Sequence, residues 1–254
     1  MRVQPYAYLK QEQDGGLQFP SLGSTLVDYW RSDQGITQSG GYVVEWEGQA
    51  NGTVLEDVGQ GPIVSGSNAG FNNVDTLTFD GTNSGLGKIF NNLGGSGTGD
   101  VYMCLYAAPH PAVSSGWGAI FGFSGLQGTS NFIEAVMRSQ NSTTISVWTN
   151  PDVASNDDTY GKGIYTVAVG DNDPVGMSFY NKDTSNTSAG GSFVGGYKTA
   201  RQGFTIGTYN IDLGGQLNGK VDVAGLAIFV NPPAPENRLN DMAAIEAYFQ
   251  TLYG

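Results

Sequence analysis

The sequence predicts an all-β domain closed by one C-terminal helix, and three observations support this. Glycine is abundant, at 39 of 254 residues, and charged residues make up only 13%. Short apolar runs alternate with segments rich in Gly, Asn, Ser and Thr, as is typical of many short strands joined by turns. The C-terminal residues instead repeat at helical spacing. One undivided β domain can reach this length, since all-β sandwiches and barrels often run to about 200–250 residues.

The apolar runs predict roughly ten to twelve strands between Leu26 and Val230. The clearest alternation lies in Val74–Asp80, where Leu77 and Phe79 face one way and the threonines between them face the other. This pattern predicts a strand with one buried face.

The proline-rich residues 231–235 cannot continue a strand, because proline has no amide hydrogen to donate. Beyond them, four apolar residues recur at intervals of three or four positions, as on one face of a helix: Met242, Ile245, Phe249 and Leu252. We therefore expect an amphipathic helix over residues 240–252, with Asn240 as its N-cap. Residues 1–24 are expected to form an extended N-terminal arm, and residues 25–254 a single domain that includes the helix.

Several short motifs, taken in order, resemble the concanavalin A-like (laminin-G-like) superfamily, in which phage virion proteins are also found. They are the segments Trp46-Glu47-Gly48-Gln49-Ala50-Asn51-Gly52, Phe79-Asp80-Gly81, Thr205-Ile206-Gly207, Gly219-Lys220-Val221-Asp222, and Leu239-Asn240-Asp241 with Tyr248-Phe249. The resemblance covers residues 26–254. It implies a two-sheet antiparallel jelly-roll sandwich, but it implies no single activity, because this fold carries many functions.

The charge of the chain argues against nucleic-acid binding. The net charge is −12, and the eleven basic residues are scattered rather than clustered to track phosphates. No segment has the apolar length of a transmembrane helix, so no membrane partner is expected. The N-terminus lacks the apolar region of a signal peptide, and we expect synthesis in a host cytoplasm. The only cysteine, Cys104, lies in an apolar run and is expected to be buried and inert.

A search for catalytic residues predicts none. A retaining glycosidase needs two carboxylates about 5 Å apart, and the family pattern that supplies them is missing. Glu45 and Glu47 share one strand face without a third acid, and Asp222 stands alone in an apolar strand. His110 lies between two prolines after a strand and is expected to be an exposed turn residue.

The residue types present are compatible with sugar binding and with calcium binding. Exposed aromatic rings beside amides can stack on and hydrogen-bond a sugar, and the candidates are Trp117, Trp148, Asn150, Tyr160 and Tyr209. Packing of these rings in the sandwich is the alternative. Calcium is the one candidate cofactor, because two loops carry carboxylates of the kind that it prefers, Asp152, Asp157, Asp158, Asp171 and Asp173. Ordinary turn chemistry explains the same residues.

The sequence thus favours a non-enzymatic virion surface or structural protein: a capsid decoration, head-fibre or tail-associated subunit. Its expected partners are other virion subunits, copies of itself in a homo-oligomer, and a cell-surface glycan; its expected location is the virion. The alternatives are a carbohydrate-binding module or lectin, and a polysaccharide-degrading enzyme.

Overall fold

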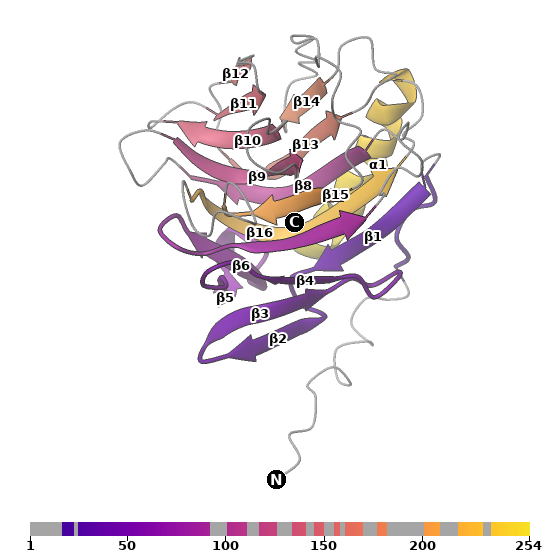
Figure 1. Cartoon of the computed structure of the whole chain (residues 1–254). Helices are drawn as coiled ribbons and strands as arrows, with labels where there is room; N and C mark the ends of the chain where they lie inside the picture. Colours follow the sequence, from indigo (N-terminus) through magenta and orange to yellow (C-terminus); the bar gives the residue numbers. More distant parts are fainter. Residues whose placement is uncertain are drawn as a thin grey trace.

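The computed structural model is a sandwich of two antiparallel β-sheets with a helix against one of them (Figure 1). The predicted all-β sandwich with one C-terminal helix is confirmed. The structure describes residues 17–22, 25–91, 101–110, 117–125, 134–140, 145–149, 155–157, 161–169, 177–181, 201–208, 218–230 and 235–254.

Sheet A is built around one long strand, β16. In the described residues its order is β14 (Met177–Asn181), β13 (Gly163–Val169), β8 (Val101–Pro109), β16 (Lys220–Val230), β6 (Val74–Asp80) and β5 (Ile63–Asn68). The last part of β16 also pairs with β1 (Thr25–Arg31), from Gly225 opposite Arg31 to Val230 opposite Thr25. Strands β6 and β1 therefore divide one edge of β16 between them, while β8 pairs along the other edge.

Sheet B covers the opposite side of the core. Its described strands run in the order β12 (Ser155–Asp157), β11 (Ile145–Thr149), β10 (Glu134–Gln140), β9 (Trp117–Gly125), β15 (Arg201–Ile206), β7 (Leu86–Asn91), β4 (Val54–Asp57), β3 (Tyr42–Glu47) and β2 (Ile36–Ser39). The strands pair with neighbours that are distant in sequence as well as with adjacent ones.

Side chains alternate between the two faces of each strand, so each sheet turns one row of apolar side chains into the core. Leu77 and Phe79 are fully buried there, as their spacing in the sequence predicts. Trp30 and Trp46 are also fully buried, and their indole N–H groups still find acceptors. Nε1 of Trp46 donates to the carbonyl of Arg31 at 2.8 Å, and Nε1 of Trp30 donates to the carbonyls of Trp46 and Thr53 at 3.0 Å each. These bonds join the two sheets at one end of the core.

Helix α1 (Pro235–Tyr253) packs on the outer face of sheet A, away from sheet B (Figure 1). It begins five residues before the expected start, because proline is well suited to a first helical position, and Asn240 therefore lies inside the helix. Its buried side chains, Ile245, Tyr248, Phe249 and Tyr253, meet strand residues that include Cys104, which is a buried free thiol as expected. Phe19 stacks on Tyr29 at a centroid distance of 4.3 Å and joins this second apolar cluster.

The loop that follows β3 is organised by one buried carboxylate, Asp28. It accepts hydrogen bonds from the backbone N–H groups of Ala50 at 2.8 Å, Asn51 at 3.2 Å and Thr53 at 2.8 Å. A side chain at Gly48 would collide with this carboxylate, since a Cβ there would lie 2.2 Å from its carbon. The Trp46–Gly52 motif is thus a loop wrapped around Asp28. No helix in the described residues has the length and apolar character needed to cross a bilayer.

Candidate functional site

Helix α1 leaves one end of the outer face of sheet A to a group of polar side chains. Two of these polar residues and one apolar residue lie in register on neighbouring strands: Ile63 on β5 lies opposite Thr78 on β6, which lies opposite Asp222 on β16. We call this region the open face and define it by six residues, Ile63, Ser65, Thr76, Thr78, His110 and Asp222. Ile63 is 45% exposed, which puts an apolar side chain beside the polar ones.

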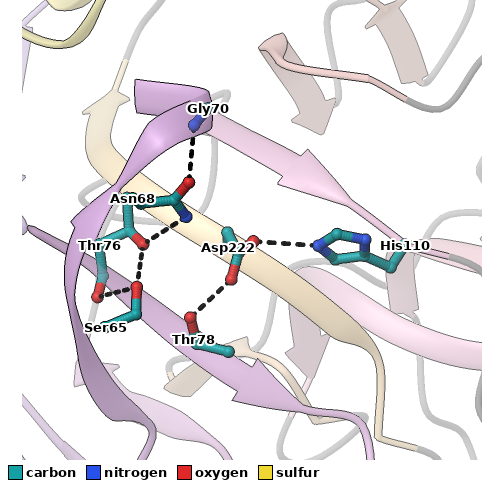
Figure 2. A network of polar contacts seen from close by, with 7 residues as sticks. All are labelled: Ser65, Asn68, Gly70, Thr76, Thr78, His110 and Asp222. Carbon is teal, nitrogen blue, oxygen red and sulfur yellow. Dashed lines mark hydrogen bonds and ion pairs between the residues drawn. The ribbon is translucent and has the colours of Figure 1, made fainter. Parts of the chain in front are cut away.

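Asp222 is the centre of the open face (Figure 2). Its Oδ2 lies 3.0 Å from Nε2 of His110, and its Oδ1 accepts a hydrogen bond of 2.6 Å from Oγ1 of Thr78. The side chain of Asp222 is 18% exposed, and that of His110 is 38% exposed. The carboxylate is therefore held in place from within the protein, while the imidazole reaches into solvent.

Strand register brings these residues together. Asp222 pairs with Ala108 near the end of β8, and His110 follows two residues later. The backbone N–H of His110 donates to the carbonyl of Lys220 at 2.9 Å, which continues the pairing one step beyond β8. His110 is consequently held by a hydrogen bond from its backbone and by another at its side chain.

A second set of hydrogen bonds supports the β5–β6 side of the open face (Figure 2). The hydroxyls of Ser65 and Thr76 lie 2.6 Å apart, and Nδ2 of Asn68 donates to Oγ1 of Thr76 at 3.0 Å. Oδ1 of Asn68 accepts from the backbone N–H of Gly70 at 2.9 Å and caps a short 3₁₀ turn. These polar groups form hydrogen bonds with one another, and the network holds their side chains in fixed orientations.

The environment of Asp222 favours its charged form. Burial by itself would raise the pKa of the carboxyl, but the hydrogen bonds from His110 and Thr78, the charge of His110 and a hydrogen bond from Asn68 together lower the pKa. An ionised carboxylate accepts from Nε2 of His110, so Nε2 carries a proton. In the neutral form of the imidazole, Nδ1 is the ring nitrogen that can accept a hydrogen bond, and no residue in the described part of the chain bonds to it.

The structure places only some of the residues that the sequence singles out. Trp117 lies in β9, Trp148 in β11 and Asp157 in β12. The other candidates lie outside the described residues: Asn150, Tyr160 and Tyr209 for sugar, and Asp152, Asp158, Asp171 and Asp173 for calcium. Within the described residues, no three His, Cys or acidic side chains gather in a way that could hold a metal ion.

The sequence treats the two central residues of the open face separately. It predicts His110 to be an exposed turn residue and Asp222 to be a lone acid in an apolar strand, whereas the two are hydrogen-bonded. Glu45 and Glu47, the other acids considered, are both exposed on β3, in agreement with their interpretation as solvated strand residues. A polar residue in the otherwise apolar strand β16 was the one signal in the sequence that pointed to the open face.

Comparisons with known proteins show a likeness in fold. No family model matches the sequence, and no curated protein matches it either. The sialidase of Trypanosoma rangeli, solved with sialic acid, superposes over 90% of this chain with a TM-score of 0.58 and 15% identity. The same enzyme solved with a difluorinated sugar acid gives a TM-score of 0.57 over 92% of this chain at 13% identity. This chain spans about a third of the sialidase, 34% of its length.

Two other enzymes overlap less closely. A carbohydrate esterase from the Shiga toxin-encoding bacteriophage phi24B gives a TM-score of 0.46 at 12% identity, over 82% of this chain and all of the esterase. A mutant α-L-arabinofuranosidase of the GH54 class gives 0.48 at 10% identity, over 82% of this chain and 51% of that enzyme.

The sialidase comparison contradicts the prediction of a non-enzymatic virion structural protein. The sialidase that shares this sandwich is a carbohydrate-active enzyme, so the fold gives no ground for predicting that the chain lacks enzymatic activity, and the virion and capsid assignments find no support. The prediction assumed that a chain without the glycosidase carboxylate pattern has no enzymatic activity. What the comparison establishes for this chain is a β-sandwich of the kind found in carbohydrate-active proteins.

Proposed function

We propose that this chain is a carbohydrate-active protein that binds a glycan at the open face of sheet A. The observation that carries the proposal is the Asp222–His110–Thr78 arrangement, an oriented carboxylate and imidazole at an end of the sheet that no described helix covers. The concanavalin A-like assignment is part of the same proposal and rests on the ordered motifs from Trp46 to Phe249.

The hydrogen-bonding capacity of Asp222 suits a sugar hydroxyl. An ionised carboxylate offers about four acceptor positions, and the hydrogen bonds from His110 and Thr78 occupy one on each oxygen. The carboxylate therefore keeps acceptor capacity for a hydroxyl donor, and Nδ1 of His110 offers a second acceptor. Ile63 supplies an apolar contact of the kind that the C–H face of a pyranose needs. A neutral sugar fits this set better than an anionic one, because Asp222 itself is negative.

Asp222→Asn is the informative variant, because it keeps the shape of the side chain and removes its charge. We expect the wild-type protein to bind glycans on an array, and Asp222→Asn to weaken that binding at least tenfold by calorimetry. Glu45→Gln is the matched control, since Glu45 is an exposed acid on sheet B, and it should bind as the wild type does. No glycan binding by the wild type, or equal binding by Asp222→Asn, would overturn the proposal.

A second candidate function is hydrolysis of an ester on a sugar, favoured by Nδ1 of His110, to which no described residue bonds. Nδ1 takes a proton from a water molecule as the water oxygen bonds to the acyl carbon. The bond from that carbon to the sugar oxygen then breaks, and His110 returns the proton to the sugar oxygen. Asp222 stays ionised throughout and keeps Nε2 protonated.

Acetate release from acetylated polysaccharides measures this second function directly. We expect it to fall about 100-fold or more in His110→Ala, within the typical range for loss of a general base, and to be retained in Glu45→Gln. Glycan binding without acetate release would leave the binding function alone and reject hydrolysis.

A further inference from the structure

A lysine on β16 adjoins the open face beside Asp222. Lys220 is exposed, Val221 is buried in the core, and Asp222 is partly buried on the outer face. Because side chains alternate along a strand, Lys220 and Asp222 lie on the same side of sheet A, with their Cα atoms about 7 Å apart. Lys220 thus places a positive charge next to the carboxylate of the open face.

The backbone of Lys220 is held by neighbouring strands, whereas its ammonium group is not. Its carbonyl accepts the hydrogen bond from the N–H of His110 at 2.9 Å, and it lies opposite Asp80 on β6. The carboxylate of Asp80 accepts from groups of its own turn, the N–H of Thr82 and the hydroxyl of Ser84, at 2.8 Å each. In the part of the chain that the structure describes, no carboxylate lies within 4 Å of the ammonium group of Lys220. This group can therefore donate to a ligand.

Lys220 and Asp222 have complementary hydrogen-bonding roles. An ammonium group only donates hydrogen bonds, an ionised carboxylate only accepts them, and a hydroxyl does both. Two hydroxyls on adjacent sugar carbons can be held together, one accepting from Lys220 and the other donating to Asp222. The charge of Lys220 is offset by Asp80 and Asp222, which lie beside it on the same face. The combination therefore favours a neutral sugar over an acidic one.

The open face is wider than one sugar ring. Its residues come from β5, β6, β16 and the end of β8, which are consecutive strands of sheet A (Figure 1). Neighbouring strands lie about 4.8 Å apart, so the width from Ile63 on β5 to His110 after β8 is about 14 Å. A single pyranose ring does not reach from one end to the other, whereas two or three linked rings do.

We propose that the open face binds a neutral oligosaccharide of at least two rings that lies across the strands. Lys220 and Asp222 hold a pair of adjacent hydroxyls on one ring, and Ile63, which is 45% exposed, contacts the C–H face of the next ring. This inference rests on the proposed glycan binding. It adds the class of ligand, a chain rather than a single sugar, and it adds Lys220 as a residue that determines specificity.

Sugars of increasing length test the role of Ile63. The probes are glucose, cellobiose and cellotriose; mannose, mannobiose and mannotriose; and xylose, xylobiose and xylotriose, with binding followed by calorimetry and saturation-transfer NMR. In at least one series we expect the wild type to bind the disaccharide about tenfold more tightly than the monosaccharide, because the second ring buries apolar surface. Ile63→Ser should lose most of this gain and keep wild-type affinity for the monosaccharide. Leu17→Ser is the matched control, since Leu17 is also an exposed apolar residue, and it should keep the gain.

Lys220→Met tests the hydroxyl pair, because it keeps the length of the side chain and removes the charge. It should weaken monosaccharide and disaccharide alike by about tenfold or more, as is typical for a hydrogen bond to a charged group. Lys220→Arg keeps a charged donor and should restore most of the affinity. Lys88→Met is the control for the loss of one positive charge, since Lys88 lies on sheet B and donates to the carbonyl of Val54.

The outcomes separate this inference from the proposed function. Thermal unfolding of each variant shows whether the fold is intact; Ile63→Ala and Lys220→Gln replace a variant that does not fold. If the wild type binds glycans and Asp222→Asn weakens the binding, three results overturn the inference alone: a disaccharide bound no better than its monosaccharide, a full length-dependent gain in Ile63→Ser, or wild-type affinity in Lys220→Met. A wild type that binds no glycan overturns both.

Discussion

Nε2 of His110 lies 3.0 Å from Oδ2 of Asp222, although the two residues are 112 positions apart in the sequence. The pair forms because β8 and β16 are antiparallel neighbours in sheet A, so the end of β8 lies beside the start of β16. It links the stability of the sheet to the ionisation of one carboxylate, which leads to a first prediction.

Asp222→Asn should lower the free energy of unfolding at pH 7 by about 1–3 kcal/mol, because hydrogen bonds to a charged group contribute more than neutral ones. The folded state lowers the pKa of Asp222. The carboxylate therefore adds stability above its ordinary pKa, and this stability is lost as the pH falls through the lower folded value. Urea unfolding of both proteins at pH 7, 5, 3 and 2 measures the difference. It should shrink below about pH 4; a difference unchanged at pH 2 would contradict this.

Asp28→Ala should cost more than Asp222→Asn, about 3–5 kcal/mol, because it removes the buried carboxylate that accepts three hydrogen bonds from backbone N–H groups. The N–H groups of Ala50, Asn51 and Thr53 all bond to this one side chain. Asp57→Ala is the control, as Asp57 is an exposed acid at the end of β4. Guanidinium unfolding followed by tryptophan fluorescence compares the two. Equal midpoints for the two variants would show that the loop does not depend on Asp28.

Gly225→Ala should loosen helix α1 from sheet A. A Cβ at position 225 would lie 2.1 Å from the ring of Phe249, so the ring or the helix that carries it must shift. We expect a loss of about 1–3 kcal/mol, as is usual for overpacking, and a change in the near-ultraviolet circular dichroism of the aromatic rings. The matched control is Gly66→Ala, where a Cβ meets nothing within 4 Å. A Gly225→Ala protein as stable as Gly66→Ala would argue against close packing at this position.

Tyr106 should make the protein sensitive to alkali. Burial, and then the charge of Glu246, raises its pKa to about 12. A raised folded pKa means that the protonated phenol adds stability below the ordinary value of about 10, and that this stability is lost between about pH 10 and 12. Tyr106→Phe should therefore unfold less steeply over that interval than the wild type. Circular dichroism during a pH titration provides the measurement, and parallel curves would refute the prediction.

The parts of the fold that follow local rules could be predicted from the sequence. Val74–Asp80 shows an alternation that only a strand satisfies, and Ile245, Phe249 and Leu252 recur at helical spacing. The start of the helix was placed at Asn240 because that residue type caps helices, but Pro235 begins it instead. Capping rules compete at neighbouring positions, and packing on the sheet selects between them.

The candidate site could not be predicted in the same way. His110 and Asp222 each have an ordinary local sequence, and their contact depends on the register between β8 and β16. The same limit applies to the contact between the hydroxyl of Tyr253 and Asp33, which joins the end of α1 to the end of β1. Long-range register is set by how whole faces pack, so no short motif records it.

The place of β16 in chain order has a consequence for how the protein folds. Its pairing joins Thr25 to Val230, and in the described residues it is the strand that unites β1, β6 and β8 in one sheet. During synthesis β1 leaves the ribosome long before β16, so it stays without this partner strand until most of the chain has been made. Contacts this distant in sequence slow folding, and strand edges left open meanwhile invite aggregation. We therefore expect slow folding, on the scale of seconds rather than milliseconds, with most of sheet A completed in the final step.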